Sequence, residues 1–463
     1  MPDSGSERVD GFILAAPFHR GALSTICRIT GVDGRPPIPF PAIMKRPRSG
    51  VGEGAESVIG FETETRILPA LSGPHVPRFV ARGRPGDAPY LVFEWIEGSN
   101  LEQIARSGPL PAERVAAIGA AAADALQSLH QQGAIHFDIK PENIVLRPGG
   151  ETVLIDFGMA RHQGFPDLLG EERRFASGSA PYISPDQVLG NRADPRSDLY
   201  SLGVVLYELA TGTLPFGIPR TLAGLRDRIW LDPAPPRTVA PGTPPWLQEI
   251  ILRCIEPDAS NRYQSAEELA RALREPAGVV LTERAAKTQR AGVLEHARRW
   301  WAARAMRPAS ATRAARAPIV MVAVDTMHPD DVRHPPLRDA IARILSLSPD
   351  FRLICVSVVN GEPLTAPADQ PGIHAEHLER LRRWVAGLEV PDARLSLHVI
   401  QSLSPAATLL RFASDNGVDL IVLGAPDPKE QALAWWRSVA SSVTANAHCS
   451  VHVVRVPRAA GTR

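Results

Sequence analysis

The last third of the chain contains five short segments made almost entirely of apolar residues, and this feature constrains the fold more than any other. Their sequences are PIVMVAVD, RLICVSVV, LSLHVI, DLIVLG and SVHVVRV. Continuous apolar runs are typical of strands buried on both faces, as in parallel sheets. The segments between the runs are long enough for the crossover helices that parallel strands require. Residues 318–456 are therefore predicted to form an α/β domain, followed by a tail at 457–463.

Residues 11–274 show a different order of elements. Strand-like runs come first (GFILAAPF, STICRI and YLVFEW), and helical patterns follow, such as ERVAAIGAAAADALQSLHQQG, which Gly133 ends. Strands that cluster before helices predict an α+β unit with a small sheet lobe at about 11–96 and a helical lobe at about 97–274. Residues 1–10 are predicted to be a flexible tail.

A basic, alanine-rich stretch at 275–317 separates the two parts and includes the pair Trp300 and Trp301. We predict a helical linker there. Such a helix could lie on a membrane surface, or it could be a solvated connector that packs its tryptophans on either domain. We favour the connector.

Length and composition agree with a globular protein of two domains. A chain of 463 residues is too long for one ordinary core, and 44% hydrophobic with 22% charged residues is typical of folded proteins. The formal net charge of +1 gives no basic field that would attract nucleic acid. We therefore expect no nucleic-acid partner.

The cysteines and the hydropathy pattern indicate a cytoplasmic protein. The four cysteines are far apart and form no CxxC pair, so we expect buried thiols in a reducing compartment rather than zinc ligands or disulfides. The N-terminal sequence MPDSGSERVDGF lacks the apolar core of a signal peptide. No window approaches 18 consecutive apolar residues, so no transmembrane segment is expected.

The segment HFDIKPEN at 136–143 carries groups suited to phosphoryl transfer. Asp138 could orient an attacking hydroxyl and accept its proton, and Lys140 could neutralise charge on the transferred group. Asn143 could hold a magnesium ion. Further along, TVLIDFGMA is a buried strand that ends at Asp156, where a carboxylate could supply a second metal ligand.

Each motif also has a purely structural interpretation. Asp138 and Asn143 could be turn residues beside Pro141, and Asp156 could cap a helix. Because both motifs occur together at a suitable separation, we prefer the catalytic interpretation.

These residues resemble those of the eukaryotic-type protein kinase family, over about residues 11–274. HFDIKPEN resembles the catalytic loop of that family, and DFG at 156–158 resembles its magnesium-binding motif. AIMK is similar to the third-strand motif, so the resemblance implies that Lys45 contacts the α- and β-phosphates of ATP. Glu64, in FETE, would be the helix partner of Lys45.

The resemblance extends to the hinge and to the end of the activation segment. YLVFEWIEG resembles the hinge whose backbone holds adenine, and Phe93 would guard the pocket behind it. GSAPYISPD resembles the end of the activation segment, with Ser179 at the position that steers Ser/Thr substrates. RSDLYSLGVVLYELATGTLPF resembles the buried central helix, whose aspartate braces the catalytic loop. The residues implied to contact ATP are Lys45, Glu64, Gly21, Ile26, Ile43, Phe93, Glu94 and Ile96. Those with structural or regulatory roles are His136, Phe157, Ser177, Ser179, Asp186, Asp198 and Arg262, of which Asp186 and Arg262 would pair.

Several positions depart from the family pattern. HRGALSTI keeps only Gly21 of three expected glycines, which let backbone N–H groups approach phosphates. Ile43 replaces a smaller residue, and Asp186 replaces a glutamate. Phe137 replaces the arginine that contacts a phosphorylated activation loop in the family. Since Phe137 does not replace a base or a metal ligand, it indicates different regulation rather than an inactive enzyme.

Residues 318–456 resemble the universal stress protein family, whose fold is a flavodoxin-like parallel sheet. VAVD places Asp325 at the end of the first strand, where nucleotide-binding members contact their ligand. Those members carry three spaced glycines followed by Ser or Thr. Here Gly424 is followed by Asp427, Arg437 and Ser438, and an aspartate repels phosphate. We expect a sensing or dimerising module that does not bind ATP.

The leading hypothesis is a cytoplasmic, bacterial-type Ser/Thr protein kinase that uses ATP with Mg²⁺, or with Mn²⁺ instead. Its partners would be proteins with Ser/Thr acceptors, and the resemblance leaves open that it phosphorylates itself and dimerises through the C-terminal domain. A pseudokinase scaffold with weak nucleotide binding is one alternative, supported by the poor glycine-rich loop. A small-molecule phosphotransferase is another, but Lys140 and the full activation segment argue against it.

Overall fold

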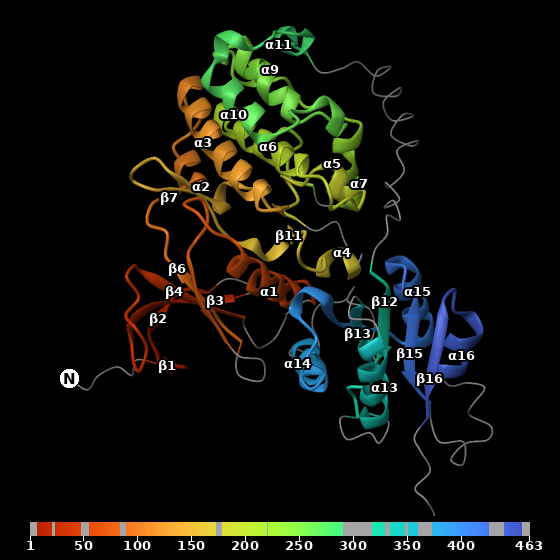
Figure 1. The fold of residues 1–463 in the computed structure, drawn as a ribbon. Helices are drawn as coiled ribbons and strands as arrows, with labels where there is room; N and C mark the ends of the chain where they lie inside the picture. The colour runs from red at the N-terminus through yellow and green to blue at the C-terminus, as the bar shows by residue number, and fades with distance from the viewer. Residues whose placement is uncertain are drawn as a thin grey trace, which may run out of the picture.

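The structure is a computed structural model, and it describes residues 7–20, 24–47, 55–83, 89–172, 178–219, 221–289, 317–328, 334–347, 351–359, 373–425 and 439–455. Figure 1 shows a sheet-rich small lobe, a helical large lobe and a C-terminal α/β part. Several residues singled out from the sequence, and the tail at 457–463, lie outside these ranges; the residues are Gly21, Ser177, Trp300, Trp301, Asp427, Arg437 and Ser438.

The small lobe is one antiparallel sheet in the order β1-β2-β3-β4-β6-β5, accompanied by helix α1. Apolar side chains alternate along its central strands, so one face packs around residues such as Cys27 and Met44. The elements are β1 (Glu7–Val9), β2 (Phe12–Arg20), β3 (Ser24–Val32), β4 (Ala42–Pro47), β5 (Phe79–Arg82), β6 (Leu91–Glu94) and α1 (Ala55–Ile67).

Strand β1 corrects the prediction of a flexible tail at 1–10. Residues Glu7–Val9 pair antiparallel with β2. Glu7 also accepts a 2.8 Å hydrogen bond from Arg46 on β4, and Arg8 forms a 2.7 Å ion pair with Asp33. Three polar or half-exposed residues carry no apolar alternation, so the sequence pattern gave no strand signal there.

The large lobe is mainly helical, as predicted. The short strands among its described residues are β7 (Ser99–Asn100), β8 (Ala134–Ile135), β9 (Ile144–Leu146), β10 (Thr152–Leu154) and β11 (Arg161–His162). The helices are α2 (Leu101–Ala105), α3 (Ala112–Gln131), α4 (Leu168–Glu172), α5 (Pro185–Val188), α6 (Arg196–Thr211), α7 (Leu222–Arg226), α8 (Pro236–Val239), α9 (Pro245–Cys254), α10 (Ala266–Arg274) and α11 (Glu283–Ala286).

Helix α6 forms the centre of this lobe. Almost all of its residues are buried, which is expected of a helix surrounded by other helices. A Cβ atom on Gly203 would lie 2.4 Å from Cβ of Cys254, so this glycine allows α6 and α9 to pack closely. Because α6 is rigidly packed, its N-terminal end is a firm support for the catalytic loop.

The first part of the predicted linker packs on the large lobe. Thr282 and Ala285 donate backbone hydrogen bonds of 2.9 and 3.0 Å to the buried carboxylate of Glu249 on α9. Gln248 donates to the carbonyls of Arg284 and Lys287. The chain up to residue 289 is thus an extension of the large lobe, and residues 290–316 lie outside the described part.

The C-terminal part is a parallel five-stranded sheet in the order β14-β13-β12-β15-β16, which confirms the predicted α/β pattern. The strands are β12 (Ile319–Ala323), β13 (Arg352–Val359), β14 (Leu395–Gln401), β15 (Leu420–Gly424) and β16 (Ser450–Val454). The helices are α13 (His334–Leu347), α14 (Ile373–Val385), α15 (Pro405–Asn416) and α16 (Val439–Asn446).

Helices cover both faces of this sheet. Leu337 of α13 and Leu381 of α14 pack on one face with Val322, while Phe412 of α15 and Val443 of α16 pack on the other face. This two-sided burial explains why the strands are apolar at consecutive positions.

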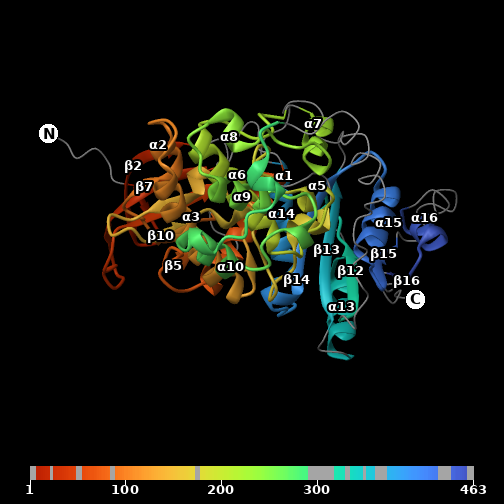
Figure 2. The ribbon, with the colours of Figure 1, turned by 90° about the horizontal axis from the view of Figure 1, so that it is seen from above.

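The C-terminal part lies against the small lobe and the activation segment. In Figures 1 and 2, α14 lies between α1 and the strands β12 and β13. All four cysteines are free, and three of them are buried as expected, while Cys449 is half-buried. Among the described residues, no helix has the length and apolar character needed to span a membrane.

Candidate active site

The catalytic-loop segment brings Asp138, Lys140 and Asn143 together. Asn143 donates hydrogen bonds of 2.9 Å to the backbone oxygen and 3.1 Å to the Oδ2 atom of Asp138. The Nζ atom of Lys140 lies 3.0 Å from the same Oδ2 atom. Pro141 begins a short 3-10 helix, Pro141–Asn143, because its fixed φ and missing N–H suit a first helical position. This turn brings the side chains of Lys140 and Asn143 into contact with that of Asp138.

Ser179 closes the other side of this cluster. Its backbone N–H donates a 2.9 Å hydrogen bond to Oδ1 of Asp138, and its hydroxyl accepts a 3.0 Å hydrogen bond from Lys140. The end of the activation segment therefore contacts Asp138, the carboxylate expected to accept the proton of a substrate hydroxyl.

Asp198 fixes the backbone of the catalytic loop by accepting hydrogen bonds from two of its N–H groups. Its carboxylate is fully buried at the start of α6, where the helix dipole favours a negative charge. It accepts hydrogen bonds of 2.9 Å from the N–H of His136 and 2.8 Å from that of Phe137. Phe137 has a φ of 60°, a left-handed conformation that costs a non-glycine residue about 1–3 kcal/mol. Asp198 stabilises this strained turn.

Lys45, Glu64 and Asp156 form an ion-paired group between the lobes. Nζ of Lys45 on β4 lies 2.6 Å from Oε2 of Glu64 on α1 and 2.9 Å from Oδ1 of Asp156. Burial would lower the pKa of Lys45, but the carboxylates of Asp156 and Glu64 raise it above its usual value. The charge of Lys45 in turn lowers the pKa of Asp156 to about 2. The group therefore places one ammonium between two carboxylates at the junction of the lobes.

The segment around Asp156 is fixed by contacts with α1 and with the catalytic loop. Asp156 has a φ of 66°, and Phe157 is buried beside the ring of His136, at 5.0 Å between centroids. A Cβ atom on Gly60 of α1 would lie 3.4 Å from the carbonyl oxygen of Gly158. Helix α1 and this segment therefore pack directly on each other at these two glycines.

Asn143 and Asp156 have the chemistry of a magnesium site. Oxygen ligands from one or two side chains, completed by phosphates and water, are what Mg²⁺ prefers. The Asp156 side chain is 44% exposed, so its carboxylate can be reached from outside. The described residues hold no cluster of three His, Cys, Asp or Glu side chains that would form an all-protein metal cage. The donor set fits magnesium bound together with a nucleotide.

The residues predicted to contact adenine line the junction between the lobes. Ile43 is buried on β4 and Phe93 on β6, and Ile96 is buried two residues after the end of β6. Ile26, on β3, lies opposite Lys45 of β4. The N–H groups of Glu94 and Trp95, however, donate to the carbonyls of Arg78 and Pro41. Adenine would therefore have to use other backbone groups of this hinge.

The predicted pair at the end of the activation segment is formed. Nη2 of Arg262 lies 2.7 Å from Oδ2 of Asp186, although Asp186 is one methylene shorter than the glutamate of the family. Arg262 is fully buried and also donates to the carbonyls of Glu256 and Pro257.

Two connections were missed in the sequence. The carboxylate of Glu94 accepts hydrogen bonds from Arg78 of the small lobe and Arg147 of the large lobe, at 2.9 and 2.7 Å, so it ties the lobes at the hinge. The guanidinium of Arg192 lies 4.6 Å from the centre of the Phe137 ring, and its Nε lies 3.0 Å from Oδ2 of Asp167.

In the family, an arginine at the position of Phe137 contacts the activation segment, and here Arg192 makes a contact with that segment instead. Phe137 cannot pair with an anion itself, but its ring supports a cation that holds a carboxylate of the activation segment. The aromatic residue at 137 was the available signal; it gave no indication of which cation would lie over it.

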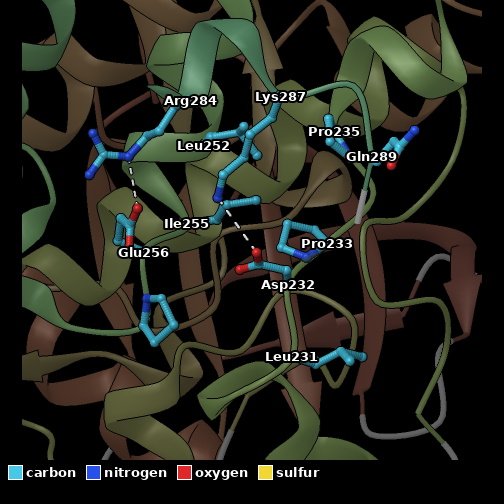
Figure 3. Close-up of a pocket in the computed structure, with 11 residues that line it drawn as sticks. Leu231, Asp232, Pro233, Pro235, Leu252, Ile255, Glu256, Arg284, Lys287 and Gln289 are labelled. Carbon is cyan, nitrogen blue, oxygen red and sulfur yellow. Dashed lines mark hydrogen bonds and ion pairs between the residues drawn. The ribbon is translucent and has the colours of Figure 1, made fainter. Parts of the chain in front are cut away.

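A surface pocket of the large lobe is separate from this site. Figure 3 shows it beside α9 and α11, with Arg284 paired to Glu256 at 2.7 Å and Lys287 to Asp232 at 3.5 Å. Its volume of about 20 Å³ holds little more than one water molecule. It cannot accommodate a nucleotide.

The predicted ligand edge of the C-terminal domain is occupied by side chains. Thr326 lies 2.6 Å from the hydroxyl of Ser357 and 2.7 Å from Nδ1 of His377, and all three side chains are buried. Asp325 contacts the ring of His328 at 3.1 Å. Gly424 ends β15, while the positions after it that decided against ATP lie outside the described residues.

Comparison with known proteins places both parts of the chain in families. Residues 48–273 match the family model of the protein kinase domain, and residues 317–455 match that of the universal stress protein family. The chain therefore contains a protein kinase domain followed by a universal stress protein domain. The kinase match begins after Lys45, but β4 pairs with β6, so the strands before residue 48 belong to the same sheet.

The curated relatives are named as bacterial Ser/Thr kinases. The chain is 36% identical over 215 residues to the probable serine/threonine-protein kinase CPE1738 of Clostridium perfringens, covering 46% of this chain and 31% of that protein. It is 32% identical over 256 residues to the serine/threonine-protein kinase PknL of Mycobacterium tuberculosis, covering 55% and 63%. The chain spans less than two thirds of these relatives. The crystal structure of the Mycobacterium tuberculosis PknI kinase domain aligns with 58% of this chain and 98% of that domain, at 22% identity and a TM-score of 0.46.

Proposed function

We propose that this protein is a serine/threonine protein kinase that transfers the γ-phosphate of ATP to hydroxyl groups of proteins, and that its universal stress protein domain regulates or localises it. The observation that carries the proposal is that one structure forms both groups of contacts, Asp138 with Lys140 and Ser179, and Lys45 with Glu64 and Asp156. Phosphoryl transfer requires a group that accepts the proton of the hydroxyl, a cation that neutralises phosphate charge and a carboxylate that binds metal.

Each residue has a specific role in this mechanism. Asp138 orients the substrate hydroxyl and accepts its proton, and Lys140 neutralises charge on the transferred group. Lys45 contacts the α- and β-phosphates, and Glu64 keeps its ammonium in place. Asn143 and Asp156 would hold magnesium, which neutralises phosphate charge when it is bound. Manganese has the same ligand preference and is included in the proposal.

Ser179 supports a peptide substrate over a small molecule. It contacts both Asp138 and Lys140 at the end of an activation segment that Asp186 and Arg262 anchor. This segment forms a surface beside the acceptor carboxylate, on which a polypeptide could dock. The chain itself is included among the substrates.

The pseudokinase alternative finds support only in the poor glycine-rich loop, because the ion pairs of an active site are formed. We also propose a cytoplasmic location, since all four cysteines are free and the substrate is ATP. Incubation of the purified protein with labelled ATP and magnesium, beside an Asp138→Asn variant, tests the kinase activity. Equal labelling by both proteins would contradict it.

A further inference from the structure

Helix α1 makes charged contacts on two of its faces. Glu64 points to Lys45, whereas Glu62 and Arg66, four residues apart, share another face and form a 2.9 Å ion pair. On that face Glu62 also pairs with Arg382 of α14, and Arg66 donates a 2.7 Å hydrogen bond to the carbonyl of Leu395 on β14. The helix that positions Lys45 is thus attached to the stress protein domain.

The contact on α1 is buried and charged. The Arg66 side chain is 5% exposed, and those of Glu62 and Arg382 are 18% and 19% exposed. Burial would raise the pKa of Glu62, but Arg382 and Arg66 lower it to about 2, so Glu62 is charged. Removing one partner of a buried ion pair leaves an uncompensated charge, which destabilises the contact strongly.

Helix α4 of the activation segment is attached to the same domain. The buried ring of His398 on β14 lies 2.8 Å from Glu171 and 3.1 Å from Glu172. Asn416 donates a 3.0 Å hydrogen bond to the carbonyl of Glu171, and Arg352 pairs with the Glu171 carboxylate. Four contacts therefore hold this short helix on the edge of the parallel sheet.

Apolar contacts join these two attachments to the catalytic site. Ile59 of α1 packs with Leu168 and Leu169 of α4, and Met159, directly after the DFG segment, packs against this group. On the other side, Val58 packs against the core formed by the sheet and helices α13 and α14. Helix α1 thus lies between two apolar groups, one in the core of the stress protein domain and one that includes Met159 beside the DFG segment.

The attached arrangement has the features of an active kinase site. The Lys45–Glu64 distance is 2.6 Å, and Ser179 is bound to Asp138. At the same time, Phe137 removes the arginine that would anchor a phosphorylated segment. The segment is held instead by Arg192 from its own lobe and by the stress protein domain through α4.

We propose that the stress protein domain is an intramolecular activating clamp. It holds α1 and α4 in the arrangement that pairs Lys45 with Glu64, and its release lowers phosphotransfer. This regulation presupposes the kinase activity proposed above. The edge strand β14, which supplies His398 and the Leu395 carbonyl, is the centre of the contact, and the kinase domain covers this edge.

The test uses the full-length chain with substitutions on the stress protein side only. Arg382→Ala removes the partner of Glu62, and His398→Gln weakens the contact with α4. Arg383→Ala is the matched control, because Arg383 lies on the same helix, is 70% exposed and pairs only loosely with Glu379, at 3.8 Å. Phosphotransfer with labelled Mg-ATP and hydrogen exchange of the α1 and α4 amides are measured, after thermal unfolding has shown that each variant is folded.

The clamp predicts roughly 5- to 150-fold slower phosphotransfer for Arg382→Ala and His398→Gln, the usual range of coupling between sites. It also predicts faster amide exchange in α1 and α4, with the Arg383→Ala variant like the wild type. Folded variants with wild-type or higher activity would overturn it, and higher activity would show an inhibitory contact. If the wild type does not transfer phosphate, the kinase proposal fails, and the amide exchange alone decides whether the clamp exists.

Discussion

At the scale of single residues, the carboxylate of Asp138 is fixed by donors on both of its oxygens. Ser179 donates to Oδ1, and Asn143 and Lys140 contact Oδ2. A group held in this way needs little rearrangement when a hydroxyl arrives, which is the physical meaning of a preorganised base. Lys45 and Asp156 form an ion pair of their own, in which Asp138 takes no part.

Asp138→Asn should lower phosphotransfer by roughly 100-fold or more, the range expected for loss of a general base. ATP binding should change little, since the base is not a ligand of the nucleotide. Glu142→Gln is a suitable control, because Glu142 is an exposed carboxylate in the same short helix. Labelled-phosphate incorporation into a protein substrate measures the first effect and calorimetric titration with ATP the second. Equal losses in both variants would assign the effect to general charge rather than to the base.

Asp156→Ala should abolish the magnesium-dependent part of ATP binding, because a carboxylate that neutralises phosphate charge through the metal is lost. The measurement is the shift in Tm on adding ATP, with and without magnesium. The variant is also expected to free Lys45 from one of its two carboxylate partners, so its Tm without ligand provides the baseline. A variant that kept the wild-type magnesium-dependent shift would show that another residue binds the metal.

At the scale of elements, the activation segment is organised without an arginine in the catalytic loop. Arg192 lies over Phe137 and pairs with Asp167 just before α4, so a carboxylate of the activation segment is held by a cation without a phosphate. The Arg192 and Asp167 side chains are 9% and 20% exposed, which protects the pair from solvent screening. This arrangement would order the segment without modification.

Ser177→Ala should therefore retain most of the activity, even though Ser177 is the hydroxyl in the activation segment that we expect to be phosphorylated. Arg192→Ala should lower activity about tenfold, since charged hydrogen bonds of this kind contribute roughly 1.5–3 kcal/mol before any discount for exposure. Phosphotransfer rates of the two variants, compared in one assay, distinguish the effects. A near-complete loss in Ser177→Ala would show that a cation elsewhere reads a phosphate on this segment.

Local patterns predicted most elements, because strand alternation and helix periodicity are contiguous in sequence. That Lys45, Glu64 and Asp156 would lie together was implied by the family resemblance, not by a local pattern. The connections that were missed join residues far apart. Asp167 and Arg192 are separated by 25 positions, and His398 and Glu171 by 227. No local pattern marks such pairs, since each member alone resembles an ordinary solvated charge. Strand β1 was missed for a different reason: it is too short and too polar to show alternation.

At the scale of the whole molecule, the two domains share charged contacts that neither would make alone. Arg66 and His398 are buried against groups of the other domain, so separating the domains would expose several charges and two helices at once. Because α1 carries Glu64 and α4 packs against α1 and Met159, the proposed clamp links the relative position of the domains to the state of the site. In the proposed clamp, the stress protein domain acts through these contacts and requires no ligand of its own.

The chain of 463 residues should accordingly bind one ATP and not two. In the stress protein domain, Asp427 and Arg437 stand at sequence positions where nucleotide-binding relatives have glycines, and an aspartate there repels phosphate. The nearby edge of the sheet, after β12, is filled by the buried contacts among Thr326, Ser357 and His377. Arg437 could compensate by pairing with a phosphate, so the number of ATP sites on the chain has to be measured.

Calorimetric titration of the intact chain with ATP and magnesium gives the stoichiometry directly, and the Asp156→Ala variant serves as the control that removes metal-dependent binding in the kinase domain. One site in the wild type and none in the variant is the expected result. Two sites in the wild type, with one persisting in the variant, would make the stress protein domain a second nucleotide sensor, one that could open or close the contact with α1 and α4.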